Sequence, residues 1–190
     1  MHPHSEFVLG GQRSGKSRRG EQRAADWLAG GPDRRAVLLA TAEAGDDEMR
    51  ARIARHQADR VARVPAMTTD EATRDLAGAI RRHAAADTLV LVDCLTLWAT
   101  RWLMPLDGAP VEPADWQAAC AALDVALGEA AGPVVLVSNE IGLGLAPLSR
   151  EARHFVDELG RLHQQVAARC PAVTLMVAGL PLAVKRAGRA

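Results

Sequence analysis

A glycine-rich octapeptide near the start of the chain carries the clearest chemical signature. The stretch from Gly10 to Ser17 reads GGQRSGKS and fits the spacing G-x-x-x-x-G-K-[ST] of loops that wrap a polyphosphate. Its first and last glycines permit a tight turn that points consecutive backbone N–H groups inward. Lys16 would place a positive charge on the outer phosphates, and the Ser17 hydroxyl could ligate Mg²⁺. The sequence therefore predicts a nucleoside triphosphate site formed by Gly10, Gly11, Gln12, Arg13, Ser14, Gly15, Lys16 and Ser17.

A carboxylate ends the clearest internal strand of the sequence. The segment from Thr88 to Asp93 reads TLVLVD and is apolar until its last residue. A P-loop protein commonly keeps its Mg²⁺-organising carboxylate at such a position. Strand-terminal aspartates are common in general, so the functional interpretation of Asp93 depends on the presence of the phosphate-binding loop (P-loop) at residues 10–17. We therefore predict Ser17 and Asp93 as the metal ligands.

A histidine with many arginines around it lies on the second expected helix. Met49, Ile53 and His56 are spaced to share one helix face, which places His56 at the margin of a buried stripe. The basic residues near it are Arg50, Arg52, Arg55, Arg60 and Arg63. Spacing alone favours a solvated basic face with an incidental histidine. The other interpretation has arginines neutralising phosphates while a neutral imidazole attacks phosphorus.

A second glycine-rich segment follows a later strand. Residues 138–147 read SNEIGLGLAP. Parallel α/β sheets bind ligands at the carboxyl ends of their strands, so this segment is a candidate site. Gly and Pro also punctuate ordinary loops, and a simple connection is the alternative.

These residues must be positioned by alternating strands and helices, a pattern typical of a mostly parallel sheet with helices on both faces. The expected fold is a single P-loop NTPase-like α/β domain over residues 1–190. The expected strands cover 6–9, 35–41, 88–93, 134–138 and 173–178, the last of these being the final strand. The expected helices cover 18–28, 46–63, 70–85 and 95–104, one opened by Pro113, and 149–168.

Composition excludes several classes of function. The chain has 190 residues with 23 basic and 23 acidic side chains, so its net charge does not favour nucleic acid or anionic membranes. With two Phe and no Tyr it offers few base-stacking side chains. Its three cysteines have neither a CxxC nor a metal-ligand spacing and are expected to be reduced thiols. No apolar run could span a bilayer, and the early P-loop leaves no room for a signal peptide, so we expect a cytoplasmic protein.

Six stretches, taken in order and at compatible spacing, carry a resemblance to a known family. They are GGQRSGKS (10–17), ATAEAGDDEMRARIARH (40–56), LVDCLTLW (91–98), VSNEIGLGLAP (137–147), ARHFVDELGRLHQQVA (152–167) and AGLPLAVK (178–185). Nearly end to end, the chain resembles the bifunctional adenosylcobinamide kinase/adenosylcobinamide-phosphate guanylyltransferases of cobalamin biosynthesis. The resemblance implies two reactions: an NTP phosphorylates adenosylcobinamide, and GMP then passes from GTP to adenosylcobinamide phosphate.

The resemblance also implies roles for residues that spacing leaves undecided. It makes His56 the nucleophile that carries GMP, beside Lys16 as a catalytic group. It implies that Mg²⁺ acts with GTP or ATP and that the enzyme is a homotrimer, while composition predicts no nucleic-acid or membrane partner. The positions that match or flank the family's guanine-nucleotide site are Ala40, Thr41, Ala42, Gln57, Ala58, Asp59, Arg60, Glu71 and Asp93.

One segment departs from the family pattern. Between Arg60 and Leu76 the family usually shows a Trp and a W-x-T-x-E stretch, whereas this chain reads VARVPAMTTDEATRD. Glu71 is the position that can stand for the family's glutamate. Two alternatives to the bifunctional enzyme stay open: a kinase without guanylyl transfer, and a P-loop binding module or switch. The sequence chooses neither ATP nor GTP as phosphoryl donor and does not place the corrinoid.

Overall fold

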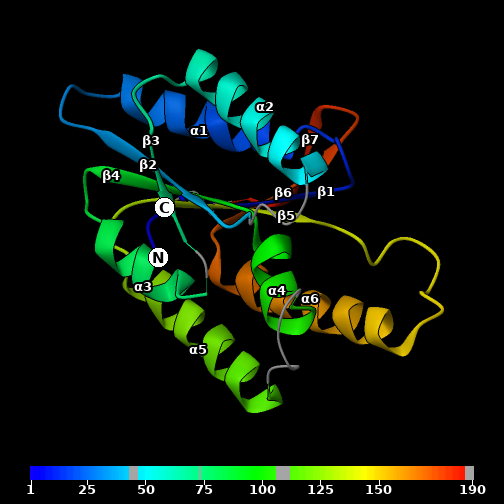
Figure 1. Cartoon of the computed structure of the whole chain (residues 1–190). Coiled ribbons are helices and arrows are strands. Elements are labelled where there is room, and N and C mark those ends of the chain that lie inside the picture. The colour runs from blue at the N-terminus through cyan, green and yellow to red at the C-terminus, as the bar shows by residue number, and fades with distance from the viewer. Residues whose placement is uncertain (43–46, 73, 106–111, 187–190) are drawn as a thin grey trace.

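The computed structural model describes residues 1–42, 47–72, 74–105 and 112–186, apart from the side chains of residues 48, 49, 52, 53, 56 and 59. The strands are β1 (Glu6–Gly10), β2 (Arg35–Ala40), β3 (Thr68–Glu71), β4 (Thr88–Asp93), β5 (Val134–Asn139), β6 (Ala172–Val177) and β7 (Leu180–Lys185). The helices are α1 (Lys16–Ala29), α2 (Asp47–Arg63), α3 (Leu76–His83), α4 (Leu95–Leu103), α5 (Pro113–Glu129) and α6 (Arg150–Arg169). The expected α/β fold is confirmed (Figure 1).

The described strands form one sheet in the order β3-β2-β4-β5-β1-β6-β7. Neighbouring strands from β3 to β6 run parallel, and β7 pairs antiparallel with β6. Parallel strands bring their carboxyl ends to the same edge of a sheet, which is where α/β proteins bind ligands. The strand that leads into the P-loop, β1, lies between β5 and β6.

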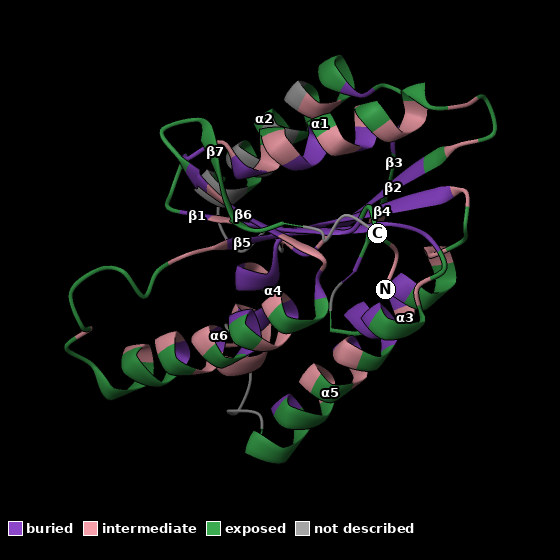
Figure 2. Cartoon of the chain, turned by 180° about the vertical axis from the view of Figure 1, so that it is seen from behind, coloured by how far each residue is buried: buried purple, intermediate pink, exposed green. Residues whose placement is uncertain are grey.

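Successive side chains along a strand point to opposite faces of the sheet and pack into two separate hydrophobic cores. On β4, Leu89 and Leu91 pack into the core beneath α1, whereas Val90 and Val92 pack into the larger core on the opposite face. Helices α1 and α2 cover one face of the sheet, and α3, α4, α5 and α6 cover the other (Figures 1 and 2). Burial on both faces explains why the central strands are continuous apolar runs.

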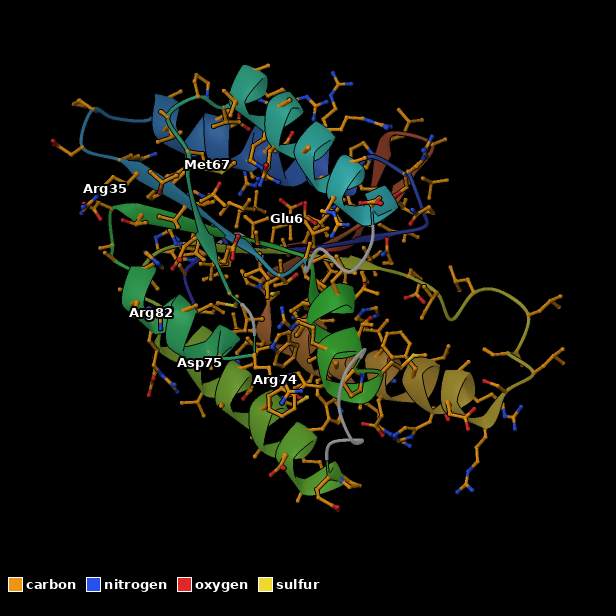
Figure 3. All side chains as sticks on the ribbon, viewed as in Figure 1. Glu6, Arg35, Met67, Arg74, Asp75 and Arg82 are labelled. Atoms are coloured by element: carbon orange, nitrogen blue, oxygen red, sulfur yellow. The ribbon has the colours of Figure 1, made fainter. Side chains whose placement is uncertain are left out.

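The expected helix over residues 70–85 is wrong in its first half. Residues 68–71 form β3, and α3 begins at Leu76 because the Asp75 carboxylate accepts the Gly78 N–H at 2.9 Å (Figure 3). The acidic pair at residues 70–71 reads like a first helical turn. The β-branched Thr68 and Thr69 instead pair beside Val37 and Leu38 of β2.

The expectation that the strand near residues 173–178 is the last one is also wrong. Ala178 and Gly179 both have positive φ, and this tight reversal brings β7 back along β6. The expected opening of a helix by Pro113 is confirmed, since Pro113 occupies the first turn of α5. Helix α6 begins after Ser149, whose hydroxyl accepts the Ala152 N–H at 3.1 Å. Within the described residues, every helix is too short or too polar to cross a bilayer.

Candidate functional site

The phosphate loop between β1 and α1 requires glycine at its first position. Gly10 has φ +154°, and a Cβ there would lie 2.5 Å from the Ser14 hydroxyl oxygen and 2.6 Å from the Met176 carbonyl oxygen. Gly15 has φ +100° and is the N-cap of α1. Because Gly15 offers no side-chain acceptor, the first N–H groups of α1 stay available to an anion.

The side chains of Lys16 and Ser14 are buried within this loop. The Lys16 residue is 7% exposed, and its Nζ donates a hydrogen bond of 2.6 Å to the Gly11 carbonyl oxygen. The Ser14 hydroxyl is buried and makes no hydrogen bond among the described atoms, so a donor is available inside the loop. Ser17, in the first turn of α1, is half-buried.

Two neighbouring strands hold the loop at the carboxyl edge of the sheet. The backbone N–H of Glu140, which directly follows β5, donates to the Gly10 carbonyl at 2.9 Å. The N–H of Gly179, in the β6–β7 turn, donates to the Ser14 carbonyl at 3.0 Å. The loop conformation is therefore fixed by segments far away in the sequence as well as by its own glycines.

The parallel register gathers other sequence-predicted residues at the same edge. Ala40 pairs with Glu71 on one side and with Asp93 on the other, so the ends of β2, β3 and β4 coincide. β4 lies two strand positions from β1, or about 10 Å at the usual strand spacing. The sheet thus brings Ala40, Glu71 and Asp93 to the edge that holds the phosphate loop.

Thr41 has a structural contact that the sequence did not reveal. Its hydroxyl donates to the Cys94 carbonyl oxygen and accepts the Cys94 N–H, both at 2.7 Å, and the residue is 1% exposed. These two hydrogen bonds connect the end of β2 to the turn between β4 and α4. Ala42, which follows it, is half-buried.

The residues expected to ligate Mg²⁺ have the right chemistry for that ion. Ser17 offers a hydroxyl and Asp93 a carboxylate, and both are half-buried. Mg²⁺ in nucleotide sites usually takes one or two protein oxygens and completes its shell with water and phosphate. The described residues contain no cluster of three or more His, Cys, Asp or Glu side chains that could hold a metal by themselves. The donor set therefore fits an ion that arrives with the nucleotide.

Helix α2, which contains His56, lies over α1 (Figure 1). The side chains of His56 and Asp59 are outside the described set, so their expected roles stay predictions; Gln57 and Ala58 are exposed and Arg60 is half-buried. At the end of the helix, Arg63 Nη1 lies 2.7 Å from a carboxylate oxygen of Glu21, whose side chain is 6% exposed. This ion pair fixes the end of α2 on the helix that starts at the phosphate loop.

A buried polar network beside β1 was not anticipated. His163 of α6 is 7% exposed; its Nε2 lies 2.8 Å from the Ser138 hydroxyl and its Nδ1 lies 3.6 Å from Glu140 Oε2. Ser138 in turn contacts the Thr96 hydroxyl at 3.0 Å. Burial lowers the pKa of His163 below its usual range, although the Glu140 carboxylate opposes this shift. The feature of the sequence that could have indicated this network is the position of His163 within the apolar stripe of a helix.

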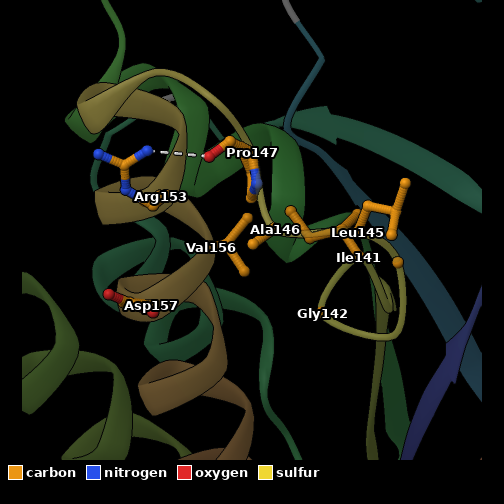
Figure 4. A pocket seen from close by; sticks show the side chains of 9 residues that line it. Ile141, Gly142, Leu145, Ala146, Pro147, Arg153, Val156 and Asp157 are labelled. Atoms are coloured by element: carbon orange, nitrogen blue, oxygen red, sulfur yellow. Dashed lines mark hydrogen bonds between the residues drawn. The ribbon is translucent and has the colours of Figure 1, made fainter.

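The second glycine-rich segment lines a cavity of about 220 Å³ against α6 (Figure 4). Its walls are mostly apolar, with Arg153 and Asp157 as the charged members. Arg153 Nη1 donates to the Pro147 carbonyl at 3.0 Å and so holds the segment against the helix. The segment includes Glu140, whose backbone N–H donates to the Gly10 carbonyl, so one stretch of chain contacts the phosphate loop and then lines the cavity.

A mostly parallel sheet with a phosphate loop after its β1 strand and helices on both faces defines a P-loop NTPase-like α/β protein. The family model for cobinamide kinase / cobinamide phosphate guanyltransferase matches residues 6–184. The chain therefore belongs to the cobinamide kinase / cobinamide phosphate guanyltransferase family, which confirms the expectation of an enzyme of cobalamin biosynthesis.

Curated relatives support this membership over nearly their whole length. A bifunctional adenosylcobalamin biosynthesis protein CobP of Pseudomonas aeruginosa is 46% identical over 181 residues, which cover 95% of this chain and 96% of the relative. A bifunctional adenosylcobalamin biosynthesis protein CobU of Salmonella typhimurium is 37% identical over 188 residues, covering 94% and 98%. A solved structure from Pyrococcus horikoshii, titled as a structural study of PH0250, has a TM-score of 0.54 at 9% identity and covers 98% of this chain and 88% of its own. That likeness concerns the fold alone.

Proposed function

We propose that this chain is a bifunctional enzyme that first phosphorylates adenosylcobinamide and then converts the product to adenosylcobinamide-GDP. The observation that carries the proposal is the glycine-dependent phosphate loop, with Lys16 folded into it, in a chain whose family match spans residues 6–184. Both reactions are transfers from a nucleoside triphosphate, and a single phosphate-binding edge would serve both.

In the kinase half, the chain's task is to bind and position a triphosphate. The backbone N–H groups of residues 10–17 surround the phosphates, and Lys16 lies on the outer ones. Ser17 and Asp93 would hold Mg²⁺, which neutralises charge on the phosphates. Either ATP or GTP is the phosphoryl donor. The hydroxyl of adenosylcobinamide takes the γ-phosphoryl group, and the nucleoside diphosphate leaves.

In the transferase half, a ring nitrogen of His56 attacks the α-phosphorus of GTP. A P–N bond forms, the bond to the bridging oxygen breaks, and pyrophosphate leaves with that electron pair. The phosphate of adenosylcobinamide phosphate then attacks the same phosphorus and releases the imidazole. The remaining residues of the proposed guanine-nucleotide site are Ala40, Thr41, Ala42, Gln57, Ala58, Asp59, Arg60, Glu71 and Asp93.

We further propose that the chain is one α/β domain that works as a cytoplasmic homotrimer. Two surfaces favour self-association: Leu145 and Leu148 of the loop after β5 are 99% and 98% exposed, and Leu180, Leu182 and Val184 of the edge strand β7 are more than half exposed. Exposed apolar patches and unpaired strand edges are typical of interaction surfaces.

The direct test is incubation with Mg²⁺ and GTP labelled at its α-phosphate. We expect acid-labile label to stay on the wild-type protein and to pass to adenosylcobinamide phosphate when that is added. His56→Ala should remove the label, whereas His154→Ala, at an exposed position of α6, should retain it. Label retained by His56→Ala would reject this nucleophile. Phosphorylation of adenosylcobinamide by a wild-type protein that takes no label would indicate the kinase alone.

A further inference from the structure

The buried network around His163 ends on a carboxylate at the phosphate loop. Glu140 follows β5, the strand between the P-loop strand β1 and the Asp93 strand β4. Its N–H bonds to the Gly10 carbonyl at 2.9 Å, so its backbone cannot move independently of the loop. Its side chain is 23% exposed and therefore accessible to a substrate.

Each oxygen of this carboxylate has its own neighbour. Oε1 accepts the Gly142 N–H at 2.8 Å, and Oε2 lies 3.6 Å from His163 Nδ1, an ion-pair distance rather than a hydrogen bond. A carboxylate oxygen has two lone-pair sites, so both oxygens can still accept a proton. The carboxylate is thus oriented without being saturated.

The histidine behind it is held by a chain of hydroxyl groups. The Thr96 hydroxyl accepts the Asn139 N–H at 2.8 Å, which leaves its own proton for Ser138. Ser138 can then donate to His163 Nε2, and this arrangement assigns the ring proton to Nδ1, facing Glu140. The opposite tautomer would turn a ring lone pair toward the carboxylate. The ring of Phe7, in β1, packs edge-on against His163 at 5.5 Å between centroids and fixes its plane.

We infer that Glu140 is the proton acceptor for the substrate hydroxyl in the kinase reaction and that His163 is the residue that positions it. This inference rests on the proposed function. In the step, the O–H bond of the acceptor breaks and its proton moves to a Glu140 carboxylate oxygen. The freed oxygen forms a bond to the γ-phosphorus, and the nucleoside diphosphate leaves with the electron pair of the broken P–O bond.

The two proposed reactions differ in their need for such a base. The acceptor in the kinase reaction is an alcohol, which must lose a proton. The acceptor in guanylyl transfer is a phosphate, which is already ionised near neutral pH. Loss of Glu140 should therefore impair the first reaction and spare the second.

The test compares Glu140→Gln with the wild-type enzyme in both reactions. The amide oxygen of Gln can still accept the Gly142 N–H, so the loop contact survives while the base is removed. We expect single-turnover phosphorylation of adenosylcobinamide to fall about a hundredfold or more. NTP affinity and GMP transfer to preformed adenosylcobinamide phosphate should stay within about threefold of wild type. Glu151→Gln, at an exposed position in the first turn of α6, is the matched control and should behave as wild type.

A pair of His163 variants tests the positioning role. Asn can retain an N–H donor at the site of Nδ1, facing Glu140, whereas Gln retains one nearer the site of Nε2, facing Ser138. We expect His163→Asn to keep most of the kinase kcat and His163→Gln to lose about tenfold in kcat with little change in KM. If both variants lose activity equally, His163 is only a packing residue.

These experiments distinguish a wrong role for Glu140 from a wrong function for the whole protein. A wild-type enzyme that phosphorylates adenosylcobinamide, together with a Glu140→Gln variant of undiminished rate, would overturn the role of Glu140 alone. Equal loss of both reactions in that variant would also overturn it, because it would indicate a damaged nucleotide site. A wild-type protein that phosphorylates no corrinoid would overturn the proposed function and this inference together.

Discussion

Lys16 is the residue on which phosphate binding depends most directly. It is nearly buried, and its ammonium is held 2.6 Å from the Gly11 carbonyl oxygen at the start of the same loop. A triphosphate would meet a charge that the fold has already desolvated and oriented. Such a preorganised charge binds more strongly than one on a free surface side chain.

Replacing Lys16 by Ala should weaken triphosphate binding by about 10- to 100-fold, which corresponds to the roughly 1.5–3 kcal/mol of a charged hydrogen bond. Isothermal titration calorimetry with GTP and with ATP measures this directly. Lys185→Ala is a suitable control, because that ammonium bonds carbonyls at the end of α6 at 2.9 and 3.1 Å. Unchanged affinity in the Lys16 variant would contradict the P-loop interpretation.

The cysteines permit a prediction about pH. Cys94, Cys120 and Cys170 are free thiols, and burial raises the pKa of each to about 12. At pH 8 only about one thiol in ten thousand would then be ionised, and the thiolate is the reactive form. We expect an aromatic disulfide reagent to label the native protein very slowly, with a rate that rises with pH up to about 12, and to label all three thiols after denaturation. Rapid labelling of the native protein at pH 8 would contradict this.

At the scale of the element, the phosphate loop allows a comparison between two adjacent glycines. Ala at position 10 would meet the Ser14 hydroxyl and the Met176 carbonyl and would adopt an unfavourable φ, whereas nothing lies within 4 Å of a Cβ at Gly11. We expect Gly10→Ala to lower the free energy of unfolding by about 1–3 kcal/mol. Gly11→Ala should change it by about 0.5 kcal/mol or less. Urea denaturation measures both values, and equal values would contradict the observed loop geometry.

Elements with strong local signals were predictable from the sequence. The apolar runs of β2, β4 and β5, the start of α5 at Pro113 and the start of α6 near Ser149 follow from a few adjacent residues. β3 and β7 could not be predicted in this way. Thr68 and Thr69 adopt β structure because β2 lies alongside, and β7 is defined by a backbone reversal at Ala178 and Gly179. Strand pairing depends on residues far apart in the sequence, and the periodicity of a single segment does not predict it.

The same distinction applies to the site. The phosphate loop is a local motif, and the arrival of Glu71 and Asp93 at one edge follows once the strands are parallel. The contact between His163 and Ser138 joins residues 25 positions apart, and that between Ser138 and Thr96 joins residues 42 apart. Only packing of α4 and α6 against the sheet brings these three side chains together, so the network was not predictable from their spacing.

At the scale of the whole molecule, the main feature among the described residues is exposed apolar surface at two places. The loop after β5 exposes Leu143, Leu145 and Leu148, and β7 exposes an apolar edge on the far side of β6. Burying such surface contributes roughly 25 cal/mol per Å². Both surfaces belong to segments that are hydrogen-bonded to the phosphate loop, since Gly179, just before β7, donates to Ser14 and Glu140, just before the exposed loop, donates to Gly10. Subunit assembly through these surfaces would therefore bear on segments that hold the phosphate loop.

We expect light scattering to give three times the chain mass for the wild-type protein. Leu182→Glu should shift this toward the monomer, because a carboxylate would be buried against another subunit. Val125→Glu, at a 47% exposed position of α5 that belongs to neither surface, should leave the mass unchanged. A wild-type monomer at micromolar concentration would contradict the proposed trimer.

The proposed guanylyl transfer requires that His56 and Lys16 act on one triphosphate. A crystal structure of the assembled protein with Mg²⁺ and a GTP analogue that cannot be cleaved after its α-phosphate tests it most directly. We expect a ring nitrogen of His56 within about 3–3.5 Å of the α-phosphorus, opposite the pyrophosphate group, with Lys16 on the outer phosphates. An imidazole packed into the core, or directed to solvent away from the nucleotide in every subunit, would contradict it.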